Sequence, residues 1–460
     1  MFDRDYLNRL QKIYSKPSND LCLLYGSRGA DLIALIKSFC NDKKWFYYNV
    51  PDVFTPLQEQ LFIRELNNHS RFLGLNKNDY ENILLTYLED SPGDKKVIVF
   101  DGFTNLYHND PTYINLIINL ISEKCAKGSV LFILMTDNVK WVNHDFNALL
   151  GRAAVEFTDI IYLKESSFDD IVNSVDFLPD NELFSLYCTI GGWPLLWKNI
   201  SKGYSGYRDF LINSLLDVNS SVFNYGLNIL PADFRQQTIY QTILYYIAAG
   251  NSRLNELYDK TGLSRAKLSV YIGNLLEHDI LYKAKSCDVG ETANIAKGVY
   301  HIKSPFVHFW YYFIFPNMSM LLTEGSDKFF KRIIVPTLCN YIDFYYPDYC
   351  IKKLYELGEN GKLDFEIYSA SKYLDKQRVI DYILESSIGR IILKCDIRSP
   401  HLSYRDYELV EKVANEAGIK YDKIALYSAG GFDQKLNMTS KVSDKLLLFD
   451  GKDRFASKYI

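Results

Sequence analysis

The chain has 460 residues, of which 48% are hydrophobic and 23% are charged, and its formal net charge is -4. This length predicts two or three domains, because single cores rarely grow so large. The small negative charge excludes a general attraction to nucleic acid, so such contact would need a local basic patch. The eight cysteines are scattered singly, which disfavours disulfide bonds and structural zinc. Neither an apolar run of eighteen residues nor a basic and then apolar leader is present, so we expect a cytoplasmic protein without membrane contact.

Helices and strands are predicted to alternate in the first third of the chain. Apolar residues at helical spacing cover 2–14, and 56–87 is long enough for two helices. Near-continuous apolar runs predict buried strands at 21–25, 45–50, 97–101, 130–136 and 160–163. Strands of this kind, separated by helices, are typical of a parallel sheet with helices on both faces, and so of an α/β fold.

The first strand ends at Gly26, and a turn of small residues then leads into an apolar helical segment. This order is typical of a phosphate-binding loop, in which backbone N–H groups face the phosphates, a lysine reaches the terminal phosphates and a hydroxyl holds magnesium. Laid without gaps from Gly26, the pattern Gly-x4-Gly-Lys-Ser/Thr places Asp31, Leu32 and Ile33 at its last three positions. The lysine and the hydroxyl are therefore missing, and a carboxylate would oppose ATP-magnesium. The degenerate nucleotide-binding loop consists of Gly26, Ser27, Arg28, Gly29, Asp31, Leu32 and Ile33.

Asp101 ends the apolar strand 97–101, where P-loop enzymes place a second magnesium ligand. The next position, which holds a water-orienting glutamate in many ATP hydrolases, is Gly102. Two interpretations of Asp101 stay open: a remnant of a magnesium site, or a cap for the following turn or helix.

A helix-turn-helix pattern covers 236–277, with helical periods over 236–249, 254–261 and 264–277. Ser264 is placed to cap the third helix, and the extended segments 280–285 and 298–303 would pair as a wing. In such winged helices the third helix enters the major groove of DNA. Its predicted outward, DNA-binding residues are Arg265, Lys267, Ser269, Tyr271 and Asn274.

The charge balance leaves the partner of this winged helix open. Residues 250–303 carry eight basic and six acidic side chains, a net charge of 8 - 6 = +2. One copy is therefore expected to bind DNA weakly and with strong salt dependence. Winged helices also serve as protein contacts, so DNA, a protein partner and self-association all remain candidates.

Several stretches together resemble the archaeal-type AAA+ ATPase family. They are Phe2-Asp3-Arg4-Asp5, Tyr25-Gly26-Ser27-Arg28, Leu35-Ile36, Val99-Phe100-Asp101, Leu150-Gly151-Arg152, Gly191-Gly192-Trp193-Pro194 and the aromatic segment 304–317. The resemblance implies a P-loop AAA+ core with a parallel sheet, a helical lid, a winged helix-turn-helix and a C-terminal α/β domain like a restriction endonuclease. We use "aromatic segment" below for residues 304–317.

The resemblance gives Gly192 and Pro194 a place in a lid motif that lies against the adenosine in relatives. The same residues also fit a plain helix stop followed by a tight turn. The aromatic segment is interpreted as a packed hinge, because so aromatic a run would otherwise promote aggregation. Within it, His308 is expected to be an interior histidine. If the chain were a divergent ATPase, Arg28 and Arg152 are the cations that could replace the missing lysine.

A tail unit is expected from 329 onward, with strands at 362–367 and 390–396. It resembles a nuclease domain in which an aspartate and a Glu-x-Lys hold magnesium beside the scissile phosphate. Asp364 fits the aspartate, but a match on Cys395 puts Lys394 in place of Glu and Asp396 in place of Lys. The charges are inverted, and Asp364 with Asp396 remain only weak candidates for a metal site.

Two sites that each lack more than one essential residue type, on a fold that keeps its glycines and aromatics, indicate a pseudoenzyme. We expect four domains: an AAA+ core at 1–165, a lid at 166–231, a winged helix with hinge at 232–317 and a nuclease-like domain at 318–460. No catalytic residue is predicted and no cofactor is required, although weak ATP or ADP binding is compatible with the loop. The expected function is a scaffold or regulator, and the alternatives are a divergent ATP-hydrolysing AAA+ ATPase and a DNA-binding regulator.

Overall fold

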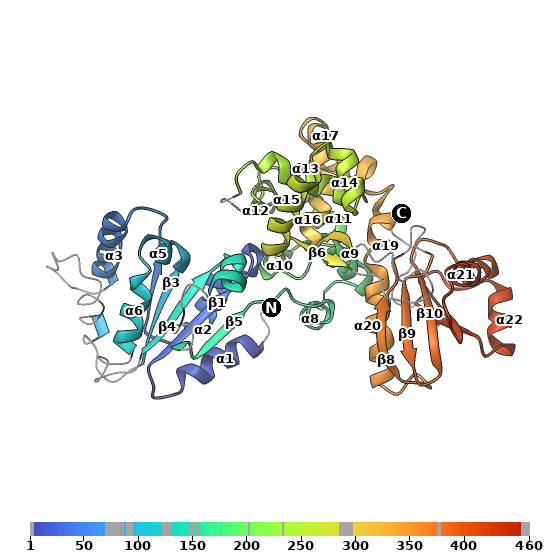
Figure 1. Ribbon diagram of the computed structural model, residues 1–460, viewed down its shortest axis with the longest axis horizontal. Coiled ribbons are helices and arrows are strands. Elements are labelled where there is room, and N and C mark those ends of the chain that lie inside the picture. Colours follow the sequence, from blue (N-terminus) through green and yellow to red (C-terminus); the bar gives the residue numbers. More distant parts are fainter. Residues whose placement is uncertain are drawn as a thin grey trace. The chain divides into compact units, whose positions relative to one another are not determined.

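The computed structural model describes residues 4–69, 84, 87–88, 95–121, 130–146, 151, 156–175, 177–200, 203–231, 234–284, 298–374 and 379–451. Phe2, Leu150, Arg152 and Lys285, which the sequence predictions include, lie outside these residues. The chain forms two compact units (Figure 1). The first unit contains 1–174, 192–202 and 277–279, and the second contains 175–191, 203–276 and 280–460. Within the described residues, no helix combines the length and the apolar character needed to cross a bilayer.

The first unit is built on a five-stranded parallel sheet in the order β2-β3-β4-β1-β5. Its strands are β1 (Asp20–Tyr25), β2 (Trp45–Asn49), β3 (Lys96–Asp101), β4 (Val130–Thr136) and β5 (Asp159–Tyr162). Its helices are α1 (Arg4–Tyr14), η1 (Arg28–Ala30), α2 (Leu32–Phe39), α3 (Thr55–His69), α5 (Phe103–Asn109), α6 (Thr112–Asn119), η3 (Trp141–Asp145), α8 (Phe168–Ser174) and α10 (Pro194–Ile200). The parallel sheet and all five of its expected strands are confirmed.

The central strands have no polar face, because every residue of β4 is buried. One face of the sheet packs through Phe100 and Phe132 against Phe62 of α3 and Phe103 of α5. Residues on both faces of a parallel strand are buried only when helices cover both faces, as they do here. Because β1, β3 and β4 pair in parallel, their carboxyl ends lie at one edge of the sheet.

The second unit begins with short helices and continues into the winged helix. The short helices are α9 (Asp180–Ile190), α11 (Tyr207–Phe210), η5 (Leu211–Leu215) and α12 (Ser221–Leu227). The winged helix consists of α13 (Gln237–Ala248), α14 (Leu254–Thr261), α15 (Arg265–Glu277) and the antiparallel strands β6 (Leu281–Ala284) and β7 (Val299–Ile302). Lys267 N–H donates to Ser264 Oγ at 3.2 Å, so the expected cap of the third helix is present.

The aromatic segment folds as α16 (Pro305–Phe309), η7 (Trp310–Ile314) and η8 (Phe315–Asn317). Phe306, Phe309 and Phe313 are buried, and Tyr341 packs beside the last two of them. The connection to the tail runs through α17 (Met318–Glu324), α18 (Ser326–Phe329), η9 (Phe330–Ile334) and α19 (Leu338–Asp343). The segment is therefore part of a core, as its composition indicates.

The tail holds a second five-stranded sheet in the order β12-β11-β10-β9-β8. Its elements are α20 (Tyr346–Glu359), β8 (Ile367–Lys372), β9 (Tyr382–Ser386), β10 (Gly389–Asp396), α21 (Tyr404–Glu416), β11 (Lys423–Ser428), α22 (Gln434–Val442) and β12 (Leu446–Asp450). Helix α20 packs against β8 and β10, and α21 and α22 pack against β11 and β12 (Figure 1). The expected strand at 390–396 is confirmed, but the one at 362–367 is wrong, because 362–366 form a turn that precedes β8.

Candidate functional sites

Sheet register brings the start of the loop and Asp101 to the same edge of the first sheet. In the pairings of β4, Tyr25 lies opposite Thr136 and Asp101 lies opposite Met135. The loop therefore begins on one side of β4 and Asp101 ends the strand on its other side. Ligands of open parallel sheets bind outside the carboxyl ends of strands where the strand order reverses, as it does at β1. Proteins that bind a nucleotide on a sheet of this kind hold it at this edge.

The loop itself is a tight turn that contains a backbone hydrogen bond between two of its own residues. Residues 28–30 form the short helix η1, in which Ala30 N–H donates to Ser27 C=O at 2.9 Å. A phosphate cradle needs consecutive N–H groups that face a ligand, and in this loop the N–H of Ala30 is directed to the loop's own carbonyl instead. The backbone of Arg28 belongs to η1, and its side chain lies outside what the structure describes.

Trp193 covers the loop at Gly29. A Cβ atom added to Gly29 would lie 2.6 Å from Trp193 Cγ and 2.9 Å from Trp193 Cδ2, much closer than any real contact. Both residues are buried, and Trp193 is 7% exposed. The indole therefore packs against the loop backbone where a side chain at position 29 would stand.

Asp31 places a carboxylate at the start of α2. Its backbone is left-handed, with φ 51° and ψ 51°, which aspartate tolerates better than most side chains. Its side chain is 7% exposed, and Lys198 Nζ lies 3.7 Å from its Oδ2. The Asp31 side chain makes no hydrogen bond to the first turn of α2, and its ion-pair partner is Lys198. Leu32 follows as the first residue of α2 and is buried, and Ile33 is half-buried.

The Gly191-Gly192 turn is held by protein groups. Gly192 N–H donates to Glu165 Oε1 at 2.6 Å, and Ser166 N–H donates to Gly192 C=O at 3.0 Å. A Cβ at Gly192 would lie 1.8 Å from the carbonyl oxygen of Ser166, so only glycine fits this approach. Pro194 starts α10 and is buried. Close packing of two backbone segments accounts for the turn without a nucleotide.

Asp101 accepts hydrogen bonds from the neighbouring strand β2 and from the residue that follows it. Tyr47 Oη donates to Asp101 Oδ2 at 2.6 Å, and Val50 N–H donates to the backbone oxygen of Asp101 at 2.7 Å. Burial raises the pKa of Asp101, and the negative charge of Asp137 raises it further. These contacts make Asp101 a structural link between β2 and the end of β3, a role that differs from both roles left open by the sequence.

The five outward residues expected on α15 divide into two groups. Arg265, Lys267 and Ser269 are exposed, and the Arg265 guanidinium lies over the Tyr258 ring at 5.3 Å. Tyr271 and Asn274 are half-buried and face α13, and Asn274 Nδ2 donates to Tyr240 Oη at 2.8 Å. The prediction that these two point outward is wrong, because the helical period turns them toward α13.

The weak metal candidates of the tail lie at opposite ends of its sheet. Asp364 precedes β8 near its pairing with Ser386, whereas Asp396 ends β10 beyond the pairing of Leu393 with Tyr382. Strands rise about 3.3 Å per residue, so the two carboxylates are separated by roughly 20 Å. Asp364 is exposed, and Asp396 Oδ1 accepts the N–H of Ser399 at 2.6 Å. The two cannot share one ion, so the proposed pair is wrong.

A different pair occupies the middle of this sheet. Lys394 Nζ lies 3.3 Å from Asp381 Oδ2, which also accepts the N–H of Cys395 at 2.8 Å. The side chains of Asp381 and Lys394 are 13% and 16% exposed. Burial raises the pKa of Asp381 to about 6, although the Lys394 charge opposes that shift. The hairpin turn at Ser386–Gly389 was the sequence signal that could have revealed this pair. The turn fixes the register of β9 with β10, and this register sets Asp381 beside the end of β10.

The comparisons with known proteins match parts of this architecture. A family model named DUF234, described as archaea bacterial proteins of unknown function, matches residues 310–409. The parallel sheet and the winged helix agree with the α/β architecture that the sequence predicts, and a DUF234 region follows the winged helix. The matched region runs from the aromatic segment through α20, the Asp381–Lys394 pair and the start of α21. It covers less than half of the chain and brings no activity with it.

Individual relatives are distant. An uncharacterised protein of Methanocaldococcus jannaschii is 24% identical over 386 residues, which are 82% of this chain and 82% of that protein. A Walker-type ATPase of Pyrococcus abyssi has a TM-score of 0.48 and 16% identity, over 68% of this chain and 96% of the other. The ORC2 protein of Aeropyrum pernix, in its ADPNP-ADP complexes, has a TM-score of 0.42 and 12% identity, over 71% and 93%. At these scores the two structures carry no argument about activity.

Proposed function

We propose that this protein is an AAA+-type pseudo-ATPase that serves as a scaffold or regulatory protein. The observation that carries this proposal is the packing of Trp193 on the loop backbone at Gly29, together with the loss of the lysine and the hydroxyl from the loop pattern. Asp31 adds a carboxylate at the same helix start. Phosphoryl transfer depends on cations that stabilise the charge of the transferring group, and this loop lacks both the lysine and the magnesium-binding hydroxyl of the usual pattern.

The tail supports the same conclusion, because it carries a positive charge where the loop carries a negative one. Lys394 brings an ammonium group to the Asp381 carboxylate, where a metal-dependent nuclease needs a divalent ion. An ammonium already paired with the carboxylate competes with a metal for the same oxygen. We therefore propose that the tail does not cleave nucleic acid and that it contributes a folded surface.

ATP hydrolysis tests this function directly. The intact chain is assayed with ATP and magnesium beside the variant Asp101→Ala, which removes the carboxylate at the end of β3. We expect phosphate release from both proteins to equal that of buffer alone. A turnover by the wild type that Asp101→Ala abolishes would establish a divergent ATPase and overturn the proposal.

DNA association is a second candidate function, favoured by one observation. Arg265, Lys267 and Ser269 are all exposed at the beginning of α15, the helix that enters the major groove in winged helices. The double variant Arg265→Glu/Lys267→Glu should abolish a gel shift that weakens steeply with salt, because both phosphate contacts are reversed in sign. Lys412→Glu on α21 is the matched control. A salt-insensitive shift, or one that survives the double variant, would contradict this candidate.

A further inference from the structure

Two adjoining cavities lie within the second unit, and neither belongs to the loop. The larger has a volume of about 670 Å³ and the smaller about 150 Å³. They share five lining residues, which are Gly250, Ser252, His301, Asn340 and Phe344. The cavities therefore meet along a common wall formed by β7, α19 and the turn after α13. A single small ligand can extend from one cavity into the other.

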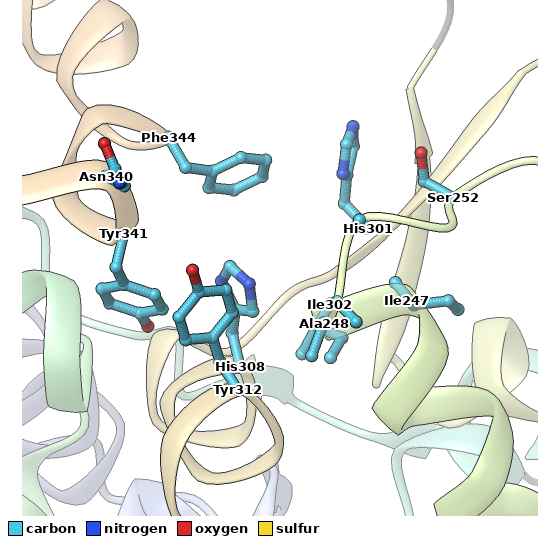
Figure 2. A pocket seen from close by; sticks show the side chains of 12 residues that line it. Ile247, Ala248, Ser252, His301, Ile302, His308, Tyr312, Asn340, Tyr341 and Phe344 are labelled. Carbon is cyan, nitrogen blue, oxygen red and sulfur yellow. The ribbon is translucent and has the colours of Figure 1, made fainter. Parts of the chain in front are cut away.

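The smaller cavity is lined by rings (Figure 2). The side chains of Phe344, His301, His308 and Tyr312 lie around one space in this view. The ring centroids of Phe344 and His301 are 5.2 Å apart, and those of Phe344 and His308 are also 5.2 Å apart. A cavity of about 150 Å³ can hold a benzene molecule, so this one has room for a single six-membered ring and not for a fused pair of rings. Aromatic walls contact such a ring edge-to-face or in an offset stack.

The larger cavity is lined by charges that are already paired. Four bases line its wall, and each lies 4.0 Å or less from a carboxylate oxygen. The pairs are Arg253–Glu256, Lys372–Asp348, Lys394–Asp381 and Arg398–Asp343. The wall therefore has no excess of either charge, and it does not select a phosphate group or a nucleic acid. It suits a ligand whose own charges cancel.

One of these ion pairs lies next to the wall that the cavities share. Asp343 directly precedes Phe344, which lines both cavities, and Arg398 Nε lies 3.2 Å from Asp343 Oδ2. A guanidinium has five N–H donors, so a contact at Nε leaves its terminal nitrogens able to bind a second carboxylate. A carboxylate accepts several hydrogen bonds, so Asp343 can receive an ammonium group while it keeps Arg398. The pair can thus bind both ends of a zwitterion without being broken.

We propose that the two cavities form one binding site for a free α-amino acid with a single aromatic ring, such as phenylalanine. The ring enters the smaller cavity beside Phe344, the α-carboxylate binds Arg398 and the α-ammonium group binds Asp343. The ligand has no net charge, so the charge balance of the wall is kept. Ser252 and Asn340 add a hydroxyl and an amide to the shared wall. The site goes beyond the proposed scaffold function, since it would give that scaffold a small-molecule ligand.

Calorimetry on the full chain tests the site with phenylalanine, tryptophan and N-acetylphenylalaninamide as probes. Phenylalanine should bind at least tenfold more tightly than tryptophan, because the fused rings of an indole exceed the smaller cavity. It should also bind at least tenfold more tightly than N-acetylphenylalaninamide, which keeps the ring but carries neither charge. Equal affinity for phenylalanine and tryptophan would overturn the assignment of the ring. Equal or tighter binding of the amide would show that the cavities hold an aromatic residue of a peptide, which also overturns the proposal.

The variant Arg398→Gln tests the carboxylate end of the ligand. It should weaken phenylalanine at least tenfold and leave N-acetylphenylalaninamide unchanged, because the amide has no carboxylate to lose. Arg405→Gln, which changes an exposed arginine on α21, is the matched control and should alter neither affinity. Unchanged affinity of Arg398→Gln for phenylalanine, or an equal loss for both ligands, would overturn the role of Arg398.

Amide hydrogen exchange of the wild-type chain locates the site without any variant. Phenylalanine at millimolar concentration should slow exchange in peptides covering 247–252, 299–312 or 338–347, and it should leave 21–36 unchanged. Protection confined to 21–36 would place the ligand at the loop, and no protection in any peptide would show that phenylalanine has no site. Either result would overturn this proposal without deciding the proposed function, which the ATP hydrolysis assay tests.

Discussion

The indole of Trp193 lies directly over the backbone of Gly29, in the loop where a nucleotide's phosphates would bind. Both residues belong to the first unit, so this contact is a property of the core itself. Any side chain at position 29 would therefore clash with the indole. The consequence for stability can be measured.

Gly29→Ala should destabilise the first unit by about 1–3 kcal/mol, because the new methyl group would overpack against the indole. Gly273→Ala is the matched control, since a Cβ there has no atom within 4 Å and alanine favours the interior of α15. Thermal and urea unfolding of the two variants give the comparison. Adding Trp193→Leu to Gly29→Ala should restore part of the loss. Equal stability of Gly29→Ala and the wild type would show that the loop is open.

Lys394→Glu should create a divalent metal site beside Asp381. The change replaces an ammonium by a carboxylate, and paired carboxylates are the ligands that Mg²⁺ and Mn²⁺ prefer. Binding of Mn²⁺, followed by electron paramagnetic resonance, should be strong in Lys394→Glu and absent from the wild type. Mn²⁺ should also raise the unfolding temperature of the variant, because the ion binds only the folded state. Lys412→Glu controls for the change in net charge. If the wild type bound Mn²⁺ as tightly as Lys394→Glu, the account would be contradicted.

The free energy of unfolding of the tail should fall as the pH rises from about 4 to about 6, because Asp381 loses its proton in this window. Its pKa is raised to about 6 by burial, so the folded chain holds the proton more tightly than the unfolded chain does. The resulting stabilisation is complete below the unfolded pKa and is lost as the pH rises through the folded pKa. Lys394 on β10 and Asp343 on α19 are the charges that face it. The loss amounts to at most about 3 kcal/mol, at about 1.4 kcal/mol per pKa unit.

Unfolding measured in urea at several pH values checks this sign. The stability difference between the wild type and Asp381→Asn should shrink as the pH rises through this window, because the amide cannot ionise. Asp364→Asn, in the exposed turn before β8, should follow the wild type at every pH. A difference that grows with pH would mean that Lys394 lowers the pKa of Asp381 instead.

The architecture could be predicted from the sequence because its signals are local. Runs such as 130–135 are apolar at every residue, and the cap at Ser264 precedes a clear helical period. The turn at 362–366 was mistaken for a strand because its alternation of polar and apolar residues imitates the period of a half-buried strand. Tyr271 and Asn274 were misplaced for a related reason, since their polarity conceals hydrogen bonds to α13.

The candidate sites were harder to predict because they depend on contacts between distant residues. The sequence shows that Asp31 replaces the usual residue of the loop pattern. It does not show that Trp193 and Lys198 contact the loop in the folded chain. The Asp381–Lys394 pair likewise depends on the register of β9 with β10. The cavities among β7, α19 and the tail need the folded second unit, so no motif could have revealed them.

Amide hydrogen exchange of the intact chain, with and without ATP and magnesium at millimolar concentration, tests the central claim most directly. The account predicts that peptides covering 26–36 exchange at the same rate in both conditions, because the chain's own groups fill the loop. Any protection near His301 and Phe344 would report the separate cavities and leave this claim intact. Protection of 26–36 by ATP would contradict it, since a loop covered by Trp193 and charged by Asp31 cannot bind the triphosphate.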